Sequence, residues 1–334
     1  MNVLNISFMK FNLEHIQNHA EEIFHRLRWG DKFRCPYCQS DHITPSGSVR
    51  HPGLTSSGKF HHCNTCNHHF SDTSGTIFHS TKLPLWKWLC MIYYFLESPH
   101  GISSYTLAKY ISVSQPTAWR MLTLLRQHLH EQIELRNETI IDEAYFGTDW
   151  HFVPTYKKMT RIKEMERKMR EENPRWTGPL DNIHMRTINY RCAAEDKMQV
   201  AGILNYTEKK LELIYIHTIS GDLLLNHVKM RDKGIKHITT DQSPLYSGFP
   251  YPRSVCNHKK GQYKSDDGYS SNPIENIFSL IRRTWHGVYH WWRRDYCQGY
   301  LNEVAWRYNH RLLSLKDKLS ALFSLIITNG SVVA

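Results

Sequence analysis

The chain has 334 residues, enough for a sizeable core and for more than one domain. Its 42 Lys and Arg residues against 31 Asp and Glu residues give a net charge of +11, which suits a polyanionic partner, although basic membrane-surface and other soluble proteins share this surplus. The longest apolar run, Leu85 to Leu96, contains Lys87 and is too short for a bilayer span, and the first residues lack a signal-peptide pattern; this excludes a membrane-spanning protein, and we expect a cytoplasmic location.

The first predicted element is a helix over residues 8–29. Gly30 follows it as a stop signal. Its apolar stripe, at helical spacing, consists of Phe11, Ile16, Ile23, Phe24 and Leu27. We expect this stripe to pack against the segment that follows.

Two Cys-x-x-Cys pairs come next, separated by a Gly- and Ser-rich, hairpin-like segment over residues 46–59. Each pair can present two thiolates to one tetrahedral ion, and four cysteines leave no open position for chemistry. The expected compartment disfavours disulfides, and the presence of two pairs disfavours a redox motif. The prediction is a structural Zn²⁺ on Cys35, Cys38, Cys63 and Cys66.

The histidines beside the second pair are surplus ligands in this interpretation. We expect them on the surface or facing a nucleic acid: His61, His62, His68 and His69. Residues 70–78 are predicted to form the closing strands of the same zinc-binding unit. The other cysteines, expected to be reduced and partly buried, are Cys90, Cys192, Cys256 and Cys297.

Residues 83–130 are predicted to be helical. An apolar helix over 83–97 is followed by a short helix over 105–111, capped at Ser103 and Ser104, and by a third over 118–130 that starts at Ser114. Two short helices joined by a tight turn are typical of a helix-turn-helix, although the same arrangement often serves only core packing. The basic charge favours DNA binding, through Gln115, Thr117, Arg120 and Arg126.

Two aspartates end or follow short apolar, β-branched runs. Asp142 follows Thr139-Ile-Ile, and Asp241 follows a run that begins at Ile235; both runs predict buried strands. Taken singly, Asp241 is explained as a cap of the segment at Ser243, and Asp142 as an ordinary strand end. Further strands are predicted over residues 183–192, 198–205 and 210–217, and a helix capped by Ser220 runs through Met230.

An amphipathic helix is predicted over residues 270–283, with Pro273 in its first turn. Glu275 and Arg282 lie off its apolar face, two turns apart. A lone glutamate in a first turn is explained by the helix dipole. Together with Asp142 and Asp241, however, it gives three carboxylates on rigid elements, the ligand type that a hard divalent cation takes.

The remaining segments carry weaker signals. The charged run over 157–175 predicts an exposed helix, with backbone contact to a nucleic acid as its only suggested role. Residues 285–294 are rich in aromatic and basic side chains, which suit either base stacking or ordinary core packing. A helix with one apolar face over 296–311 and a short packing helix beyond Lys318 complete the chain.

The motifs TIIDEAYFG, HITTDQSPLYSG, SSNPIENIFSLIRR and YLNEVAWRYNHR resemble the catalytic blocks of insertion-sequence transposases of the ISXO group, in the insertion sequence 1595 family. The resemblance covers nearly the whole chain, and the spacing from Asp241 to Glu275 is close to that of the DDE superfamily. It implies an α/β fold: an RNase H-like core with a mixed sheet flanked by helices, preceded by a zinc ribbon and a helix-turn-helix region.

The resemblance also implies a mechanism. Asp142, Asp241 and Glu275 would bind two Mg²⁺ ions, with Mn²⁺ as the alternative, about 3.5 to 4 Å apart at a scissile phosphate. Water would free a 3′-hydroxyl at the transposon end, and that hydroxyl would attack target DNA. Arg282 would contact the phosphate backbone.

Some members of the family use Asn at the third position, so Asn272 and Asn276 remain alternatives to Glu275. Asp266 and Asp267, in a loop, are poorer candidates. Glu143 is also a poorer candidate, because it points to the opposite face of its strand.

The predicted domains are 1–82 (helix and zinc ribbon), 83–133 (helix-turn-helix) and 134–334 (catalytic core with C-terminal helices). The expected partners are the double-stranded terminal inverted repeats and target DNA, with a homodimer or larger assembly on DNA because two ends are joined. Two other functions remain open from the residues alone: a catalytically inactive zinc-ribbon DNA-binding protein, and a Mg²⁺-dependent nuclease or resolvase.

Overall fold

The computed structural model describes residues 13–49, 58–146, 155–177, 180, 197–216, 220–257, 262–290 and 292–328. These residues divide into two compact units. The first combines the N-terminal part of the chain, up to Gln132, with the C-terminal part from Arg283, and the second runs from Ile133 to Arg282. The strand predicted over 183–192 and the first residues of the helix predicted over 8–29 lie outside the described residues.

The first unit begins with helix α1 (Leu13–Trp29) and a three-stranded antiparallel sheet. Its strands, in the order β1-β2-β3, are β1 (Ile43–Val49), β2 (Gly58–Cys63) and β3 (His69–Ser71). Strand β3 ends at Ser71, so the prediction of strands through residue 78 was wrong. From Ser71 the chain turns instead, since Ser71 N–H donates to Ser74 Oγ and Thr76 Oγ1 donates to the Thr73 carbonyl.

Three helices follow, and the second and third of them begin at the serine caps that were predicted. Helix α2 spans Leu85–Glu97, α3 spans Ser104–Tyr110 and α4 spans Gln115–His128. Ser103 Oγ accepts from the Thr106 N–H at 3.1 Å, and Ser114 Oγ accepts from the Thr117 N–H at 3.4 Å, so each hydroxyl satisfies a donor that the first helical turn leaves free.

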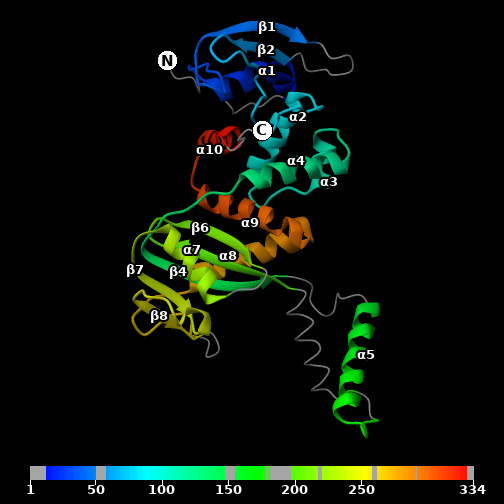
Figure 1. Cartoon of the computed structure of the whole chain (residues 1–334), viewed down its shortest axis with the longest axis vertical. Helices are drawn as coiled ribbons and strands as arrows, with labels where there is room; N and C mark the ends of the chain where they lie inside the picture. Colours follow the sequence, from blue (N-terminus) through cyan, green and yellow to red (C-terminus); the bar gives the residue numbers. More distant parts are fainter. Residues whose placement is uncertain are drawn as a thin grey trace. The chain divides into compact units, whose positions relative to one another are not determined.

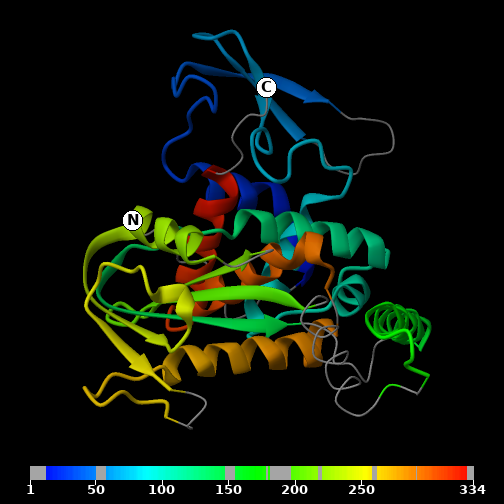
Figure 2. The same ribbon diagram turned by 60° about the horizontal axis from the view of Figure 1, so that its bottom comes forward.

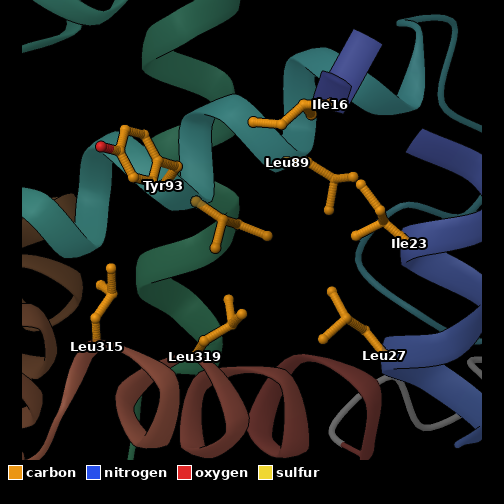
Figure 3. A pocket seen from close by; sticks show the side chains of 8 residues that line it. Ile16, Ile23, Leu27, Leu89, Tyr93, Leu315 and Leu319 are labelled. Carbon is orange, nitrogen blue, oxygen red and sulfur yellow. The ribbon is translucent and has the colours of Figure 1, made fainter. Parts of the chain in front are cut away.

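Two C-terminal helices complete the core of this unit. They are α9 (Arg294–Asn309) and α10 (Leu315–Thr328), and they follow a π-helical turn, η5 (Trp285–Tyr289). Helix α10 packs on α1 and α2, where Phe24 and Phe323 lie 6.1 Å apart between ring centroids. An apolar pocket between these three helices is lined by Ile16, Ile23, Leu27, Leu89, Ile92, Tyr93, Leu315 and Leu319 (Figure 3).

Helix α9 is buried on most of its surface rather than on one face as predicted, and it pairs with α4 through a buried ion pair. Arg126 is 3% exposed and Glu303 is 1% exposed. Arg126 Nε donates to Glu303 at 2.7 Å, and the guanidinium lies 4.1 Å from the ring centroid of Tyr300. The prediction that Arg126 contacts DNA was therefore wrong, because the buried carboxylate holds its side chain inside the unit.

The aromatic residues after α8 are also mainly core. Trp285 and Trp292 lie 4.1 Å apart, and Trp292 stacks on Tyr300 at 4.7 Å. Both tryptophans are buried, whereas Arg293 and Arg294 are exposed. Of the two roles suggested by the sequence for this segment, packing explains the tryptophans.

The second unit is built on a five-stranded mixed sheet with strand order β6-β5-β4-β7-β8 (Figure 1). Its strands are β4 (Leu135–Phe146), β5 (Met198–Asn205), β6 (Lys210–Ile216), β7 (Asp232–Asp241) and β8 (Arg253–Cys256). Strands β4, β5 and β6 are antiparallel neighbours, whereas β7 is parallel to β4 and β8 is parallel to β7. Such a sheet is consistent with the RNase H-like core that the resemblance implied.

Helices cover both faces of this sheet (Figure 2). Helix α7 (Gly221–Arg231) packs Leu224 and Val228 against Ile141 and Ile238 on one face. Helix α8 (Asn272–Thr284) packs on the other, where a Cβ on Gly202 would lie only 3.0 Å from Ile274 Cδ1 and 3.1 Å from Phe278 Cζ. A side chain at position 202 would thus hold α8 farther from the sheet.

The charged segment after β4 forms a helix, as predicted. This helix, α5, spans Thr155–Glu172, and most of its described side chains are exposed. Among the described residues, no helix combines the length and the apolar character needed to cross a bilayer.

Candidate functional site

Asp142 and Asp241 lie on the two central, parallel strands of the sheet. Strand β4 pairs with β7 so that Ile140 is opposite Thr239, and each aspartate follows its paired residue by two positions. Because side chains alternate along a strand, both aspartates start from the same face, at the same end of the strands. The structure thus brings two of the three predicted carboxylates together; their catalytic role stays a prediction.

Glu143 joins these two aspartates. Carboxylate oxygens of Asp142, Glu143 and Asp241 all lie within 4.8 Å of one another. Glu143 Oε1 accepts a hydrogen bond of 2.6 Å from the hydroxyl of Tyr246, which is fully buried. Strand alternation predicted that Glu143 points away from the aspartates. The structure corrects this: Glu143 lies beyond the last residue pair of β4 with β7, and its longer side chain reaches the cluster from the opposite face.

The third predicted carboxylate, Glu275, approaches from helix α8. It is half-buried in the first turn of this helix, next to Ile274, which packs over Gly202. Gly202 is the direct antiparallel partner of Asp142. The three carboxylates within 4.8 Å do not include Glu275, but its charge is close enough to raise the pKa of Asp142. Asn272 and Asn276 are exposed.

The site makes an ionised carboxylate costly. Burial raises the pKa of Asp142 to about 8, and the charges of Glu275, Glu143 and Asp241 add to this effect. Burial likewise raises the pKa of Glu143 to about 7, with Asp241 contributing. Both shifts mark a place where carboxylates are buried and close together.

Asp142 also has an oxygen that needs a partner. The residue is 4% exposed; its Oδ1 accepts from the backbone N–H of Glu143 at 2.9 Å, whereas its buried Oδ2 has no hydrogen-bond partner among the described residues. An unpaired buried carboxylate oxygen is unfavourable unless a cation or donor completes it. The donor set consists of carboxylate oxygens only, which fits a hard divalent cation such as Mg²⁺.

The four predicted zinc ligands come together in the first unit. Cys35 Sγ lies 3.6 Å from Cys66 Sγ, and Cys38 Sγ lies 3.5 Å from Cys63 Sγ. These Sγ–Sγ distances are longer than the S–S bond of a disulfide, about 2.05 Å. They are close to the roughly 3.8 Å expected between the sulfurs of two thiolates bound to one tetrahedral zinc. The backbone N–H of Cys66 helps to lower the pKa of Cys63 to about 6, whereas burial raises the pKa values of Cys35 and Cys66, so the case for zinc rests on the geometry of the four sulfurs. The cluster therefore fits a structural zinc.

A polar network connects this sheet to α1. Asp72 accepts from Trp29 Nε1 at 2.9 Å and lies 3.0 Å from His25 Nδ1, and Arg28 donates to the Asp72 carbonyl. His61 is buried with Nε2 3.4 Å from Asp72, so its predicted surface position was wrong. His68 and His69 are exposed, as expected, and His62 is half-buried.

The residues predicted to contact DNA are distributed over both units. Gln115 Nε2 donates to Ser104 Oγ at 2.8 Å, and the Thr117 hydroxyl lies 2.8 Å from that of Ser114. Arg120 is exposed on α4. Arg282 is exposed on α8, with its guanidinium 5.6 Å from the ring centroid of Phe146.

Sequence reasoning missed Tyr246 and Gly202 and rejected Glu143. A signal existed for Tyr246, which follows Asp241 after a Ser-Pro turn and returns to the same end of the sheet. For Gly202, the signal was a glycine inside an otherwise apolar strand, which often marks a close backbone approach.

Comparison with known proteins agrees with this geometry. Residues 134–309 match the ISXO2-like transposase domain, and this range contains Asp142, Asp241 and Glu275. Over 278 residues the chain is 26% identical to an uncharacterized protein in transposable element ISH50 of Halobacterium salinarum, an alignment that covers 80% of this chain and 82% of that protein. The resemblance found in the motifs is thus confirmed, and the chain belongs to the family of ISXO2-like transposases.

Proposed function

We propose that this protein is a DDE-type transposase that cleaves DNA at the ends of an insertion sequence and joins those ends to target DNA. The observation that carries the proposal is Asp142, a buried aspartate with an unpartnered oxygen that lies beside Asp241 in a domain of the transposase family. Asp142, Asp241 and Glu275 are the proposed catalytic carboxylates, and Mg²⁺, or Mn²⁺ in its place, is the proposed cofactor.

The carboxylates are oriented by the strands that carry them. The backbone N–H of Glu143 donates to Asp142 Oδ1, and the backbone N–H of Ser243 donates to Asp241 Oδ1, each at 2.9 Å. When bound, Mg²⁺ would lower the pKa of the attacking hydroxyl and stabilise the charge that develops on the phosphate and the leaving oxygen. Glu275 adds a third carboxylate from α8. Arg282, exposed two turns along the same helix, would contact the phosphate backbone.

We assign recognition of the DNA ends to residues 1–82 and 83–133, and catalysis to residues 134–334. Zinc on the four cysteines would hold the ribbon together. Helices α3 and α4 would act as a helix-turn-helix, in which Arg120 reaches a phosphate and Gln115 and Thr117 stand at the start of the recognition helix. The partners are the terminal inverted repeats and a target duplex, and joining two ends requires at least a dimer on DNA.

A strand-cleavage assay tests this function. The zinc-loaded protein is incubated with Mg²⁺ and a labelled duplex that carries the terminal repeat found beside its coding region. We expect a product ending in a 3′-hydroxyl, and its transfer to a plasmid would distinguish a transposase from a simple nuclease. Asp241→Asn should reduce cleavage by at least about a thousandfold, whereas Asp266→Asn, in the loop before α8, should not. Equal cleavage by Asp241→Asn and the unmodified protein would refute the proposal.

A further inference from the structure

Tyr246 holds the side chain of Glu143 in place, and this contact is the evident role of the Tyr246 hydroxyl. Tyr246 is fully buried among apolar side chains of the second unit, including Ile141 and Leu224, where phenylalanine would fill nearly the same space. Its hydroxyl donates a 2.6 Å hydrogen bond to Glu143 Oε1. A charge-assisted bond this short restricts the carboxylate to one position.

One short segment positions both Asp241 and this tyrosine. Asp241 ends β7, Ser243 caps the helical turn η3 (Pro244–Tyr246), and Asp241 accepts from the Ser243 N–H. The turn packs tightly, since a Cβ on Gly221 would lie 2.3 Å from the Leu245 carbonyl oxygen. The segment therefore fixes Asp241 directly and Glu143 through Tyr246, at the same end of the sheet.

The resulting cluster has the properties of an incomplete cation site. Oxygens of Asp142, Glu143 and Asp241 lie within 4.8 Å of one another, a separation that one cation or an adjacent pair can bridge. Independently, Asp142, nine-tenths buried, has an oxygen with no hydrogen-bond partner among the described residues. Clustered carboxylates with such an unsatisfied oxygen point to a ligand with positive charge.

We propose that Glu143 is a metal ligand of this centre together with Asp142 and Asp241, and that Tyr246 is its positioning residue. The inference rests on the proposed function, because it adds a fourth carboxylate to the three expected from the DDE pattern. The ligand is a hard divalent cation. Glu143 supplies an oxygen from the face of the sheet opposite α8, so the centre receives carboxylates from both faces.

The test is Mn²⁺ binding to the full-length, zinc-loaded protein without DNA, measured by titration with detection of free Mn²⁺ by electron paramagnetic resonance. Glu143→Gln keeps the shape and can still accept from Tyr246, but it loses the charge; we expect its Kd for Mn²⁺ to rise about a hundredfold. Tyr246→Phe should raise the Kd about tenfold, the effect of losing a hydrogen bond that orients a ligand. Asp266→Asn is the control and should bind as the unmodified protein does.

The outcomes separate the two proposals. If Glu143→Gln binds Mn²⁺ as tightly as the unmodified protein while Asp142→Asn binds weakly, the role of Glu143 is refuted and the proposed catalytic site stands. If neither Glu143→Gln nor Asp142→Asn changes the Kd, both proposals fail. If Glu143→Gln weakens binding but Tyr246→Phe does not, the positioning role is refuted. Melting temperatures of the zinc-loaded variants, measured without added Mn²⁺, show that each variant is folded.

Discussion

Replacing Glu303 by leucine should destabilise the first unit strongly, because this carboxylate neutralises a buried guanidinium. Glu303 accepts from Arg126 at 2.7 Å, from the Tyr289 hydroxyl at 2.8 Å and from Arg307 at 2.8 Å. Burial would raise the pKa of Glu303, but Arg126 and Arg307 lower it, so the group is charged. Without it, Arg126 would stay buried and lose the ion-pair partner that the structure shows for it, a situation that costs about 3 to 5 kcal/mol.

Replacing its partner, Arg126, should reduce the free energy of unfolding by a smaller amount. In Arg126→Met, Glu303 would keep its hydrogen bonds from Tyr289 and Arg307, so we expect a loss of about 2 kcal/mol, typical of one hydrogen bond to a charged group. The double variant should lose clearly less than the sum of the two single losses, since removing both partners leaves no unpaired charge at position 126.

Urea unfolding followed by tryptophan fluorescence measures these free energies. The control is Glu171→Leu, which removes an exposed pair with Arg167 on α5 and should cost less than about 1 kcal/mol. A loss below about 1 kcal/mol for Glu303→Leu, or strict additivity in the double variant, would refute the role given to this ion pair.

Three further predictions concern the two candidate metal centres. Gly202→Ala should move α8 and Glu275 away from Asp142 and reduce DNA cleavage at least about tenfold, whereas Gly248→Ala, with no neighbour within 4 Å of its added Cβ, should leave cleavage unchanged. Cys63→Ser should lower the zinc content, measured by atomic absorption, and the melting temperature, because three thiolates hold the ion less tightly than four. Without added Mg²⁺ or Mn²⁺, the free energy of unfolding should fall as the pH rises from about 4 to 8, because folded Asp142, with a pKa of about 8, keeps a proton that the unfolded chain, with a pKa near 3.8, releases. The part of this fall that comes from Asp142 has a ceiling of about 6 kcal/mol, and Asp142→Asn should remove that part, leaving the smaller contribution of Glu143; an unchanged pH profile in that variant would contradict the raised pKa of Asp142.

Local signals in the sequence were sufficient where a single segment determines the structure. Ser103, Ser114 and Ser220 were predicted as helix caps, and each hydroxyl accepts a backbone N–H in the first turn of its helix. The strands over 198–205 and 210–217 were predicted within one residue of β5 and β6. In these cases the structure depends on residues a few positions apart in the sequence: a serine hydroxyl and a nearby backbone N–H, or alternating apolar residues within one strand.

Arg126 shows where such reasoning fails. It was classed by its charge, yet it lies four residues after Leu122 and eight after Ala118, on the buried face of α4. Helical periodicity marked this position as internal. Its partner Glu303 is distant in the sequence, so only the packing of α4 on α9 makes a buried charge acceptable there.

The prediction that Glu143 points away from the site was wrong for a different reason. Strand alternation correctly separates it from Asp142 at the backbone, but alternation describes the direction of Cβ and not the reach of a long side chain beyond the last pair of β4 with β7. The hydrogen bond from Tyr246 settles its position, and that contact depends on a turn about a hundred residues farther along the chain.

The discontinuity of the first unit has a consequence for biosynthesis. Helices α1, α2 and α4 leave the ribosome before the second unit, but α9 and α10, which pack against them, are translated only after it. Residues 133–282 are therefore synthesised while apolar side chains such as Leu89 and Ile92 still lack part of their cover. The nascent chain should depend on chaperones until α10 has been translated, and termination before α9 should release a product prone to aggregation.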